Sequence, residues 1–433
     1  MNRGKRKIGL AGAISIGIGG MVGGGIFAVL GEAVSLAHGG TPMAFFVAGM
    51  VALLTSYAYA KLSVKYPSQG GTVVFIDTAF GNNIASGSVN LMLWLSYLVT
   101  IALYAVAFAS YALTFFHDNA STLIKHVLIS TAVVLPTAIN LISASFVSKS
   151  ETAIVALKLV LLAVIIVFSI SYVDPELVST AHWGSMSSIF AAGMIIFVAY
   201  EGFELIANSA EDVQNPKRNL PIAFYSSVIL VFALYLLIGI VTVSTVPEDE
   251  LLTAKDYALA IAAKPALGRT GFLVVAIAAL LATFSAINAT IYGNARLGYV
   301  LAKEGQLPEI FDKKVWNEPV TGVVVTAVIS LLMANTINLK EIAIIGSASF
   351  LFIFALINAS AFKLRKEIGG SRYIYIVAVL LSVTALMTLL INTFESNFRA
   401  IFVFAAFICV SVLFEVTYGK KLRGHFMGRR YGP

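Results

Sequence analysis

Long stretches of this 433-residue chain contain no charged residue. None of Asp, Glu, Lys or Arg occurs between Asp77 and Asp118, or between Arg218 and Glu248. A helix needs about 20 apolar residues to cross the hydrocarbon core of a bilayer. Charged residues make up 12% of the chain, which is about half of what soluble domains carry. Such a chain cannot cover a soluble surface, and the sequence predicts an integral membrane protein.

Two other classes of protein do not fit the same pattern. Strands of outer-membrane barrels alternate apolar and polar residues over about ten positions, whereas the apolar runs here do not alternate. Cys409 is the only cysteine, so a disulfide-stapled secreted scaffold is excluded. The first apolar run is too long for a cleavable signal peptide and has no small-residue cleavage site. The sequence therefore predicts an all-α membrane protein.

Apolar runs bounded by charges or turn residues predict twelve membrane-spanning helices. Twelve spans of about 20 residues need about 240 residues, which leaves room for short loops. Two further stretches, 68–81 and 248–265, are predicted to form surface helices. The predicted spans are 8–34, 42–63, 84–116, 123–145, 151–173, 187–209, 220–245, 269–301, 319–337, 341–363, 372–392 and 398–419.

The basic residues are distributed unevenly over the predicted loops. Most of the 29 Lys and Arg residues lie before the first span, in the loops on that same side, or after Tyr418, whereas Glu248, Asp249 and Glu250 lie in an opposite loop. Loops rich in Lys and Arg stay in the cytoplasm, so we expect both termini of this multi-pass protein on the cytoplasmic side of the cell membrane. The net charge of +7 then reports orientation, and no soluble segment is long enough to bind nucleic acid.

Three adjacent glycines, Gly23, Gly24 and Gly25, lie in the middle of the first predicted span. Each costs about 1 kcal/mol relative to alanine in a helix interior. In lipid such a break is tolerated only where the freed backbone groups find other partners. Scattered glycines such as Gly12 and Gly17 are typical of close helix packing. The triplet instead favours an unwound turn whose amide groups face a ligand.

The sixth predicted span contains a matching interruption. Its centre reads Phe197-Val198-Ala199-Tyr200-Glu201-Gly202-Phe203-Glu204, and carboxylates at membrane depth indicate a functional site. The first and sixth spans are each the first helix of a five-helix set. Transporters with inverted repeats place interrupted helices at these matching positions, with the substrate between them. Amides at a half-helix N-terminus attract an anion, and carbonyls at the other ends attract a cation. The pattern therefore predicts a site for a zwitterion.

Four motifs in the chain carry a resemblance to a known family. Together they resemble, in the same order, the signatures of the amino acid–polyamine–organocation (APC) superfamily, and the lysine in the fifth span resembles its sodium-independent, ApcT-like branch. The motifs are 20–27 (GMVGGGIF), 67–72 with 80–81 (PSQGGT and FG), 215–221 preceded by Glu211 (NPKRNLP), and 288–296 leading into 302–308 (NATIYGNAR and AKEGQLP).

The resemblance implies the LeuT-type fold, with two inverted five-helix repeats, about 8–173 and 187–366, followed by two helices over about 372–419, all in one transmembrane domain. It also implies secondary transport of amino acids by alternating access. Carried over to this sequence, the amides of the triplet would bind the substrate carboxylate. Tyr200 would line the pocket or support its closure. The substrate amine would be bound by carbonyls at Ile18, Gly19, Phe197 and Ala199.

Lys158 is the only charged residue between Thr152 and Val173. Its ammonium could lie between the first, fifth and eighth spans, replace a bound sodium ion and exchange a proton during transport, because burial lowers the pKa of lysine. Alternatively, the side chain could snorkel to the cytoplasmic interface. Spacing alone does not separate the two, and the resemblance favours the coupling role. In that role Ser285 of the eighth span is a candidate neighbour.

The two acids of the sixth span have separate candidate roles. Glu204 resembles an acidic position found in several family members, and either hydrogen-bonds to hold the interrupted helix or titrates during transport. Glu201 stands where relatives usually carry an apolar residue, so it could bind a second cation on the substrate, pair with Lys158 or satisfy backbone donors. Val198 replaces a large aromatic gate found in many members, which predicts a wider or differently gated pocket.

The leading functional hypothesis is a proton-coupled importer of amino acids. The alternative is an exchanger of amino acids or polyamines, with Glu201 reading a cationic side chain. A membrane enzyme, a channel or a sensor is disfavoured because no catalytic triad, phosphate loop, pore repeat or soluble domain is visible. All five histidines fall at loops or span ends, so we expect no metal site and no cofactor. The oligomeric state is left open.

Overall fold

The computed structural model describes residues 8–116, 121–142, 144–312 and 320–422. Its described residues form helices joined by short loops, and its only extended pairings are two isolated bridges, Ile8 with Val213 and His38 with Trp183. The α-helices are α1 (Leu10–Met21), α2 (Gly25–Ala37), α3 (Thr41–Lys65), α4 (Thr72–Phe80), α5 (Ile84–Leu113), α6 (Thr122–Ile142), α7 (Ala144–Ser169), α8 (Met186–Ile195), α9 (Leu205–Asn208), α10 (Pro216–Thr245), α11 (Glu248–Thr253), α12 (Ala258–Ala262), α13 (Lys264–Lys303), α14 (Val320–Thr336), α15 (Leu339–Lys363), α16 (Arg365–Ile368), α17 (Arg372–Ser396) and α18 (Phe398–Leu422). The 3₁₀ helices are η1 (Ile170–Tyr172), η2 (Thr180–His182), η3 (Ile196–Glu204), η4 (Ala210–Asp212), η5 (Lys255–Tyr257) and η6 (Glu309–Phe311).

Long helices correspond to most of the twelve predicted spans, and the exact number of spans stays a prediction. Among the described residues, 10 helical segments are long and apolar enough to cross a membrane, and α1 with α2 forms one further span that bends by 43° at its break. The ninth predicted segment is α14, an apolar helix whose 17 residues are fewer than those of the other spans. The predicted surface helices correspond to α4 and to the α11–η5–α12 segment. The prediction of an all-α membrane protein is confirmed.

Local sequence signals set several helix ends. The side chain of Asn83 accepts a hydrogen bond from Ser86 N–H (3.0 Å) and caps α5, and Asn338 caps α15 in the same way through Glu341 N–H (2.9 Å). Short polar side chains of this kind satisfy the amides that a helix start leaves without partners. At the start of α10, Asn215 has a positive φ of 46° and Pro216 takes the first helical position, where proline is well tolerated.

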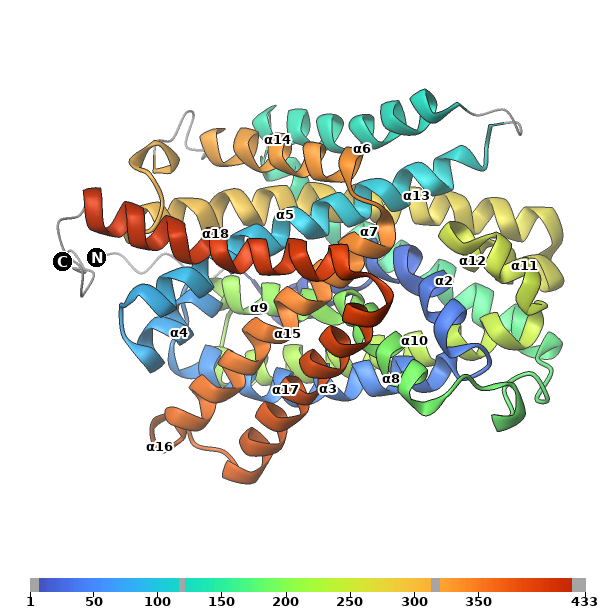
Figure 1. Ribbon diagram of the computed structural model, residues 1–433, viewed down its shortest axis with the longest axis horizontal. Helices are drawn as coiled ribbons and strands as arrows, with labels where there is room; N and C mark the ends of the chain where they lie inside the picture. The colour runs from blue at the N-terminus through green and yellow to red at the C-terminus, as the bar shows by residue number, and fades with distance from the viewer. Residues whose placement is uncertain (1–7, 117–120, 143, 313–319, 423–433) are drawn as a thin grey trace.

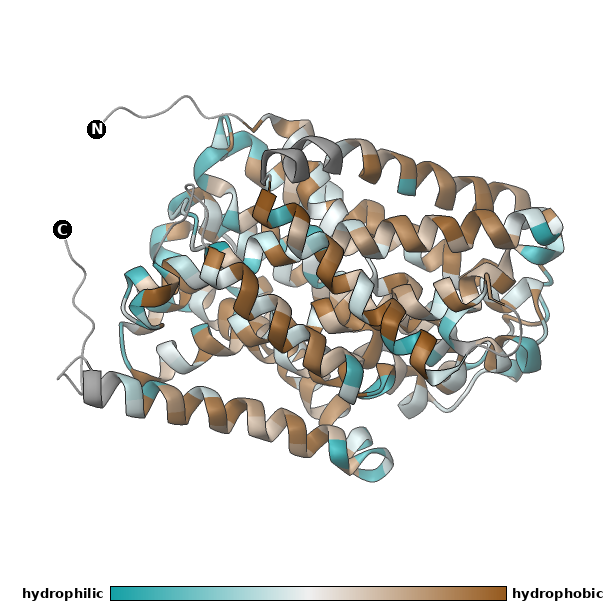
Figure 2. Cartoon of the chain, turned by 90° about the horizontal axis from the view of Figure 1, so that it is seen from above, coloured by the Kyte–Doolittle hydropathy of each residue, from teal (hydrophilic) through white to brown (hydrophobic). Residues whose placement is uncertain are grey.

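The molecule has two polar ends and an apolar middle. Figure 1 shows the long helices running between an end that holds both termini, called here the terminal end, and an opposite far end that includes the C-terminal end of α2 with α11 and α12. In Figure 2 hydrophilic residues gather at these two ends and hydrophobic residues cover the long helices between them. This banding is what a bilayer-spanning protein requires.

Burial separates inner helices from outer ones. In α5 and in the Met186–Asn208 segment, 89% of the apolar window is buried, against 22% in α6 and α18. On the outer helices large apolar side chains such as Leu380 (61% exposed) and Phe402 (67% exposed) face outward. A bilayer would cover them. The two interrupted helices, which carry the candidate site, therefore lie in the centre of the bundle.

Candidate substrate site at two interrupted helices

The first interruption lies where the glycine triplet predicts it. Helix α1 ends at Met21, Val22 leaves the helical region with φ −79° and ψ 44°, and its N–H donates to Ile18 O (2.7 Å). Helix α2 begins at Gly25, and its N-cap Gly24 offers no side-chain hydrogen bond. The first amides of a helix have no partner within it and carry the positive end of its dipole. The break thus presents backbone donors suited to an anion.

At each glycine of the triplet, a neighbouring residue lies too close for a larger side chain. A Cβ on Gly24 would overlap the ring of Tyr104 in α5, one on Gly25 would lie 2.7 Å from Ala199 Cα in η3, and one on Gly23 would lie 2.8 Å from Ala286 Cβ in α13. The break is therefore enclosed by three different elements. Close packing and chain interruption occur together here, whereas the sequence presents them as alternatives.

The second interruption lies where the sequence predicts it, but its backbone conformation is different. The sequence predicts an unwound segment, but residues Ile196–Glu204 form a nine-residue 3₁₀ helix, η3, between α8 and α9. Runs of 3₁₀ helix longer than three or four residues are uncommon and often mark a hinge or a strained sequence. Ser347 of α15 stabilises this one, because its Oγ accepts from Val198 N–H (2.9 Å) and donates to Ile195 O (2.7 Å).

The two interrupted helices cross at a pair of glycines. A Cβ on Gly20 would lie 2.5 Å from Gly202 O, and a Cβ on Gly202 would overlap the backbone of Gly20. Beside this crossing, the hydroxyl of Tyr235 in α10 lies 2.7 Å from Met21 O and 3.3 Å from Ala199 O. One side chain therefore holds the carbonyls of both breaks.

The carbonyl groups predicted to bind the substrate amine differ in whether they already accept a hydrogen bond. Ala199 O is held by Tyr235, and Ile18 O already accepts from Val22, although a carbonyl oxygen has a second lone pair. The ring of Phe197 packs edge-on against Phe354 of α15, with 5.8 Å between centroids. Gly19 is buried in the last turn of α1, where carbonyls lack helical partners. All four predicted acceptors belong to the two interrupted spans.

Tyr200 faces the scaffold. Its hydroxyl donates to Phe45 O in α3 (3.1 Å), and its ring lies 5.0 Å from that of Tyr235. Of the two predicted roles, these contacts favour support of closure over lining of the pocket.

Glu201 and Glu204 are three residues apart on η3, and side chains at that spacing eclipse each other in a 3₁₀ helix. Thr100 of α5 donates to Glu201 Oε1 (3.0 Å), while Tyr59 of α3 (3.0 Å) and Thr72 of α4 (3.3 Å) donate to Glu204 Oε2. The residues are 3% and 0% exposed. Within the described part of the chain, Glu201 Oε2 has no hydrogen-bond partner, whereas Tyr97 of α5 also hydrogen-bonds to Glu204. Glu201 is thus anchored through one oxygen only.

Lys158 lies on the inner face of α7. It belongs to a buried stripe with Val155, Leu162 and Ile165, whereas Leu157 and Val160 on the other face are exposed. Its side chain is 2% exposed, so the alternative of snorkelling to the interface does not describe this conformation. Helix α7 packs against both α1 and α13. Ser285, also buried, belongs to α13.

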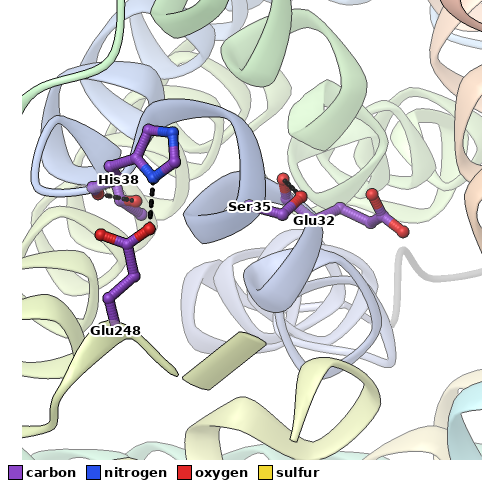
Figure 3. Close-up of polar contacts among 5 residues, drawn as sticks. Glu32, Ser35, His38 and Glu248 are labelled. Carbon is purple, nitrogen blue, oxygen red and sulfur yellow. Dashed lines mark hydrogen bonds and ion pairs between the residues drawn. The ribbon is translucent and has the colours of Figure 1, made fainter. Parts of the chain in front are cut away.

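Side chains at the far end tie α2 to its surroundings. His38 at the end of α2 contacts the carboxylate of Glu248 at the start of α11, and Figure 3 shows the Glu32 carboxylate pointing away from this pair. Glu32 is buried, and its Oε2 lies 3.9 Å from Lys340 Nζ at the start of α15. The same helix α15 therefore contacts α2 through Lys340 and η3 through Ser347.

Sequence reasoning missed several residues of the site. Tyr235, Ser347, Thr100 and Tyr59 all donate to backbone or carboxylate groups of the interrupted helices. The available signal was a hydroxyl inside an apolar span, because buried hydroxyls need partners. No group of His, Cys, Asp and Glu side chains within the described ranges is arranged to hold a metal ion.

The fold and the site define a helical membrane transporter with its candidate site at two interrupted spans. The chain belongs to the amino acid permease family, whose model matches residues 8–416. It is 36% identical over 433 residues to an uncharacterized protein of Methanocaldococcus jannaschii, covering 98% of both chains. It is also 34% identical to the inner membrane transport protein YbaT of Escherichia coli, covering 92% and 93%, and 24% identical to the methylthioribose transporter of Bacillus subtilis, covering 81% and 79%. The family consists of transporters, and the protein is a multi-pass amino acid transporter rather than an enzyme.

Proposed function

We propose that this protein imports amino acids across the cytoplasmic membrane by proton-coupled alternating access. The observation that carries the proposal is the arrangement at the two breaks, where amides that start α2 lie beside carbonyls that end α1 and carbonyls of η3. A free amino acid carries one negative and one positive group at a fixed short separation. It matches donors and acceptors placed in this way.

In the proposed bound state, the amides of Gly23, Gly24 and Gly25 bind the carboxylate. Carbonyls of Ile18, Gly19, Phe197 and Ala199 bind the ammonium group. Tyr235 holds the Ala199 carbonyl in the present conformation, so substrate binding replaces or shares this hydrogen bond. The residues of both breaks are buried, and the conformation therefore has to open before a substrate can bind.

Lys158 is the proposed site of proton coupling, with Glu204 and Ser285 as partners in that role. A charged ammonium would stabilise the packing of α7 against α1 and α13, and loss of its proton would release that packing. Two inverted repeats, 8–173 and 187–366, would then change their relative positions about the crossing of α1 and η3. The helices over 372–419 lie outside this symmetry. Both termini would lie in the cytoplasm, which puts the far end outside.

A second candidate function is exchange of cationic amino acids or polyamines. It rests on Glu201, whose Oε2 is buried and has no hydrogen-bond partner among the described residues. A substrate with a second ammonium group would supply one. Under this alternative, Glu201→Gln weakens uptake of lysine and putrescine much more than uptake of neutral amino acids.

Uptake by purified protein in liposomes tests the proposal. Liposomes receive each of the twenty tritiated L-amino acids, with and without an inward proton gradient. We expect the gradient to raise the accumulation of at least one amino acid, and Lys158→Ala to abolish that stimulation. Lys61→Ala, which removes a lysine at the terminal end of α3, is the matched control and should retain it. Uptake that ignores the gradient but requires internal amino acid would favour the exchanger.

A further inference from the structure

A pocket of about 760 Å³ opens at the far end of the molecule, away from both breaks. We call it the far-end pocket and define it by six of the residues that line it, Lys125, Asp256, Tyr257, Lys264, Arg269 and Phe272. They come from the start of α6, from η5 and from the start of α13, and Ser110 of α5 completes one wall. A cavity of this size is within the range that binds small molecules.

The charges of the far-end pocket are of both signs. Lys264 Nζ lies 3.4 Å from Glu250 Oε1, outside the lining, and 5.4 Å from the Phe272 ring centroid. Neither Lys125 nor Arg269 forms an ion pair within the described part of the chain. The one acid of the lining, Asp256, accepts from Ser110 Oγ through Oδ2 (3.2 Å), which leaves Oδ1 to accept from a ligand. The pocket thus offers cations for a carboxylate and a carboxylate for an ammonium group.

The position of the far-end pocket relates it to the first break. Tyr104 of α5 covers Gly24, and Ser110 lies six residues further along the same helix, about 9 Å at 1.5 Å per residue. Tyr111, the residue after Ser110, packs edge-on against Phe27 of α2 with ring centroids 5.9 Å apart. Both η5 and α12 pack against α2. The contact between Tyr111 and Phe27 therefore connects the wall of the pocket to α2, the half-helix that begins at the break.

We propose that the far-end pocket is a second binding site for the amino acid substrate, occupied before the substrate reaches the breaks. This inference rests on the proposed function. Lys125 and Arg269 bind the carboxylate, Asp256 binds the ammonium group, and Tyr257 and Phe272 face the side chain. A phospholipid headgroup is the competing ligand, and the binding experiment distinguishes it from an amino acid.

Binding stoichiometry tests this inference. Saturating binding of a mixture of the twenty tritiated L-amino acids is measured on the full chain in nanodiscs. We expect two bound molecules per chain in the wild type and one in the double variant Lys125→Gln/Arg269→Gln. Asp256→Asn should give the same loss. Arg372→Gln, which removes an exposed cation at the terminal end, is the control and should keep two. Both cations of the double variant are at least partly exposed, so their replacement should leave the fold intact.

The outcomes separate the two claims. One molecule per chain in the wild type, with uptake in liposomes intact, overturns the far-end site and leaves the proposed function standing. No binding and no uptake of any amino acid overturns the proposed function itself. If the double variant still binds two amino acids, or if its only change is the loss of co-purified phospholipid, the inference is wrong and, in the latter case, the pocket binds lipid.

Discussion

Gly20 and Gly202 lie backbone to backbone where the two interrupted helices cross. A Cβ on either one would meet the main chain of the other. Glycine permits this approach because it has no side chain. The crossing brings the end of α1 next to the last turn of η3, and so it determines whether the two breaks can act on one ligand.

Replacing Gly202 with alanine should separate the two breaks. The added methyl group cannot be accommodated by a rotamer change, because it meets the backbone of Gly20. Overpacking of this kind costs about 1–3 kcal/mol, and we expect a lower melting temperature in detergent together with loss of amino acid binding. The matched control is Gly293→Ala in α13, where a Cβ has no atom within 4 Å. An equally small effect of both substitutions would contradict the close crossing.

Tyr235→Phe should weaken the connection between the two breaks while keeping the packing of the ring. The variant keeps the ring that packs on Tyr200 and Phe45 but removes the donor to Met21 O and Ala199 O. Loss of a buried hydrogen bond costs about 1–3 kcal/mol when a partner is left unsatisfied. We expect lower thermal stability, and a larger stabilisation by added substrate because the carbonyls are already released. Melting temperatures with and without amino acid measure the stability and the stabilisation by substrate. If both equal the wild-type values, Tyr235 does not contribute to the site.

Ser347→Ala should weaken the 3₁₀ segment. The hydrogen bonds from Ser347 to Ile195 O, at the end of α8, and to Val198 N–H, in η3, are lost, which leaves both backbone groups without this partner. Hydrogen exchange followed by mass spectrometry should show faster exchange across η3. Ser360→Ala in the same helix is the control, because Ser360 bonds only to Leu356 O of its own helix. Equal exchange in the two variants would show that η3 does not depend on α15.

Lys340→Met should release α2 from α15. The substitution removes an ammonium 3.9 Å from the buried Glu32 carboxylate while keeping a long apolar side chain. Partly exposed ion pairs contribute about 0–1 kcal/mol, so the expected loss of stability is small. The functional change should be larger, with substrate leaving through the far end faster than in the wild type. Efflux from preloaded liposomes measures this rate, and an unaltered rate would limit Lys340 to a surface role.

Much of the fold follows from the sequence, because apolar runs bounded by charges define helices wherever lipid must be crossed. The glycine triplet also predicts the break before α2. The partners of the breaks do not follow, since Tyr235 and Ser347 are distant in the chain and resemble any buried hydroxyl. Ser347, far away in the chain, hydrogen-bonds to Ile195 O and Val198 N–H at the start of η3, and Val198 and its neighbours could not indicate this contact by themselves.

The position of Lys158 illustrates a second limit. Spacing along α7 allows its side chain either to reach the interface or to turn inward, and the packing of α7 against α1 and α13 selects the inner face. That choice is a property of three helices rather than of one. The roles of Lys158, Glu201 and Glu204 in transport remain predictions.

Competition by blocked substrates tests the central claim most directly. The amino acid that shows the fastest uptake in liposomes is challenged with its N-acetyl derivative and with its carboxamide, each of which lacks one of the two charges. Because the breaks offer donors to the carboxylate and acceptors to the ammonium group, both derivatives should fail to compete at concentrations at which the unlabelled parent blocks uptake completely. If either derivative competes as well as the parent, the breaks do not recognise a zwitterion.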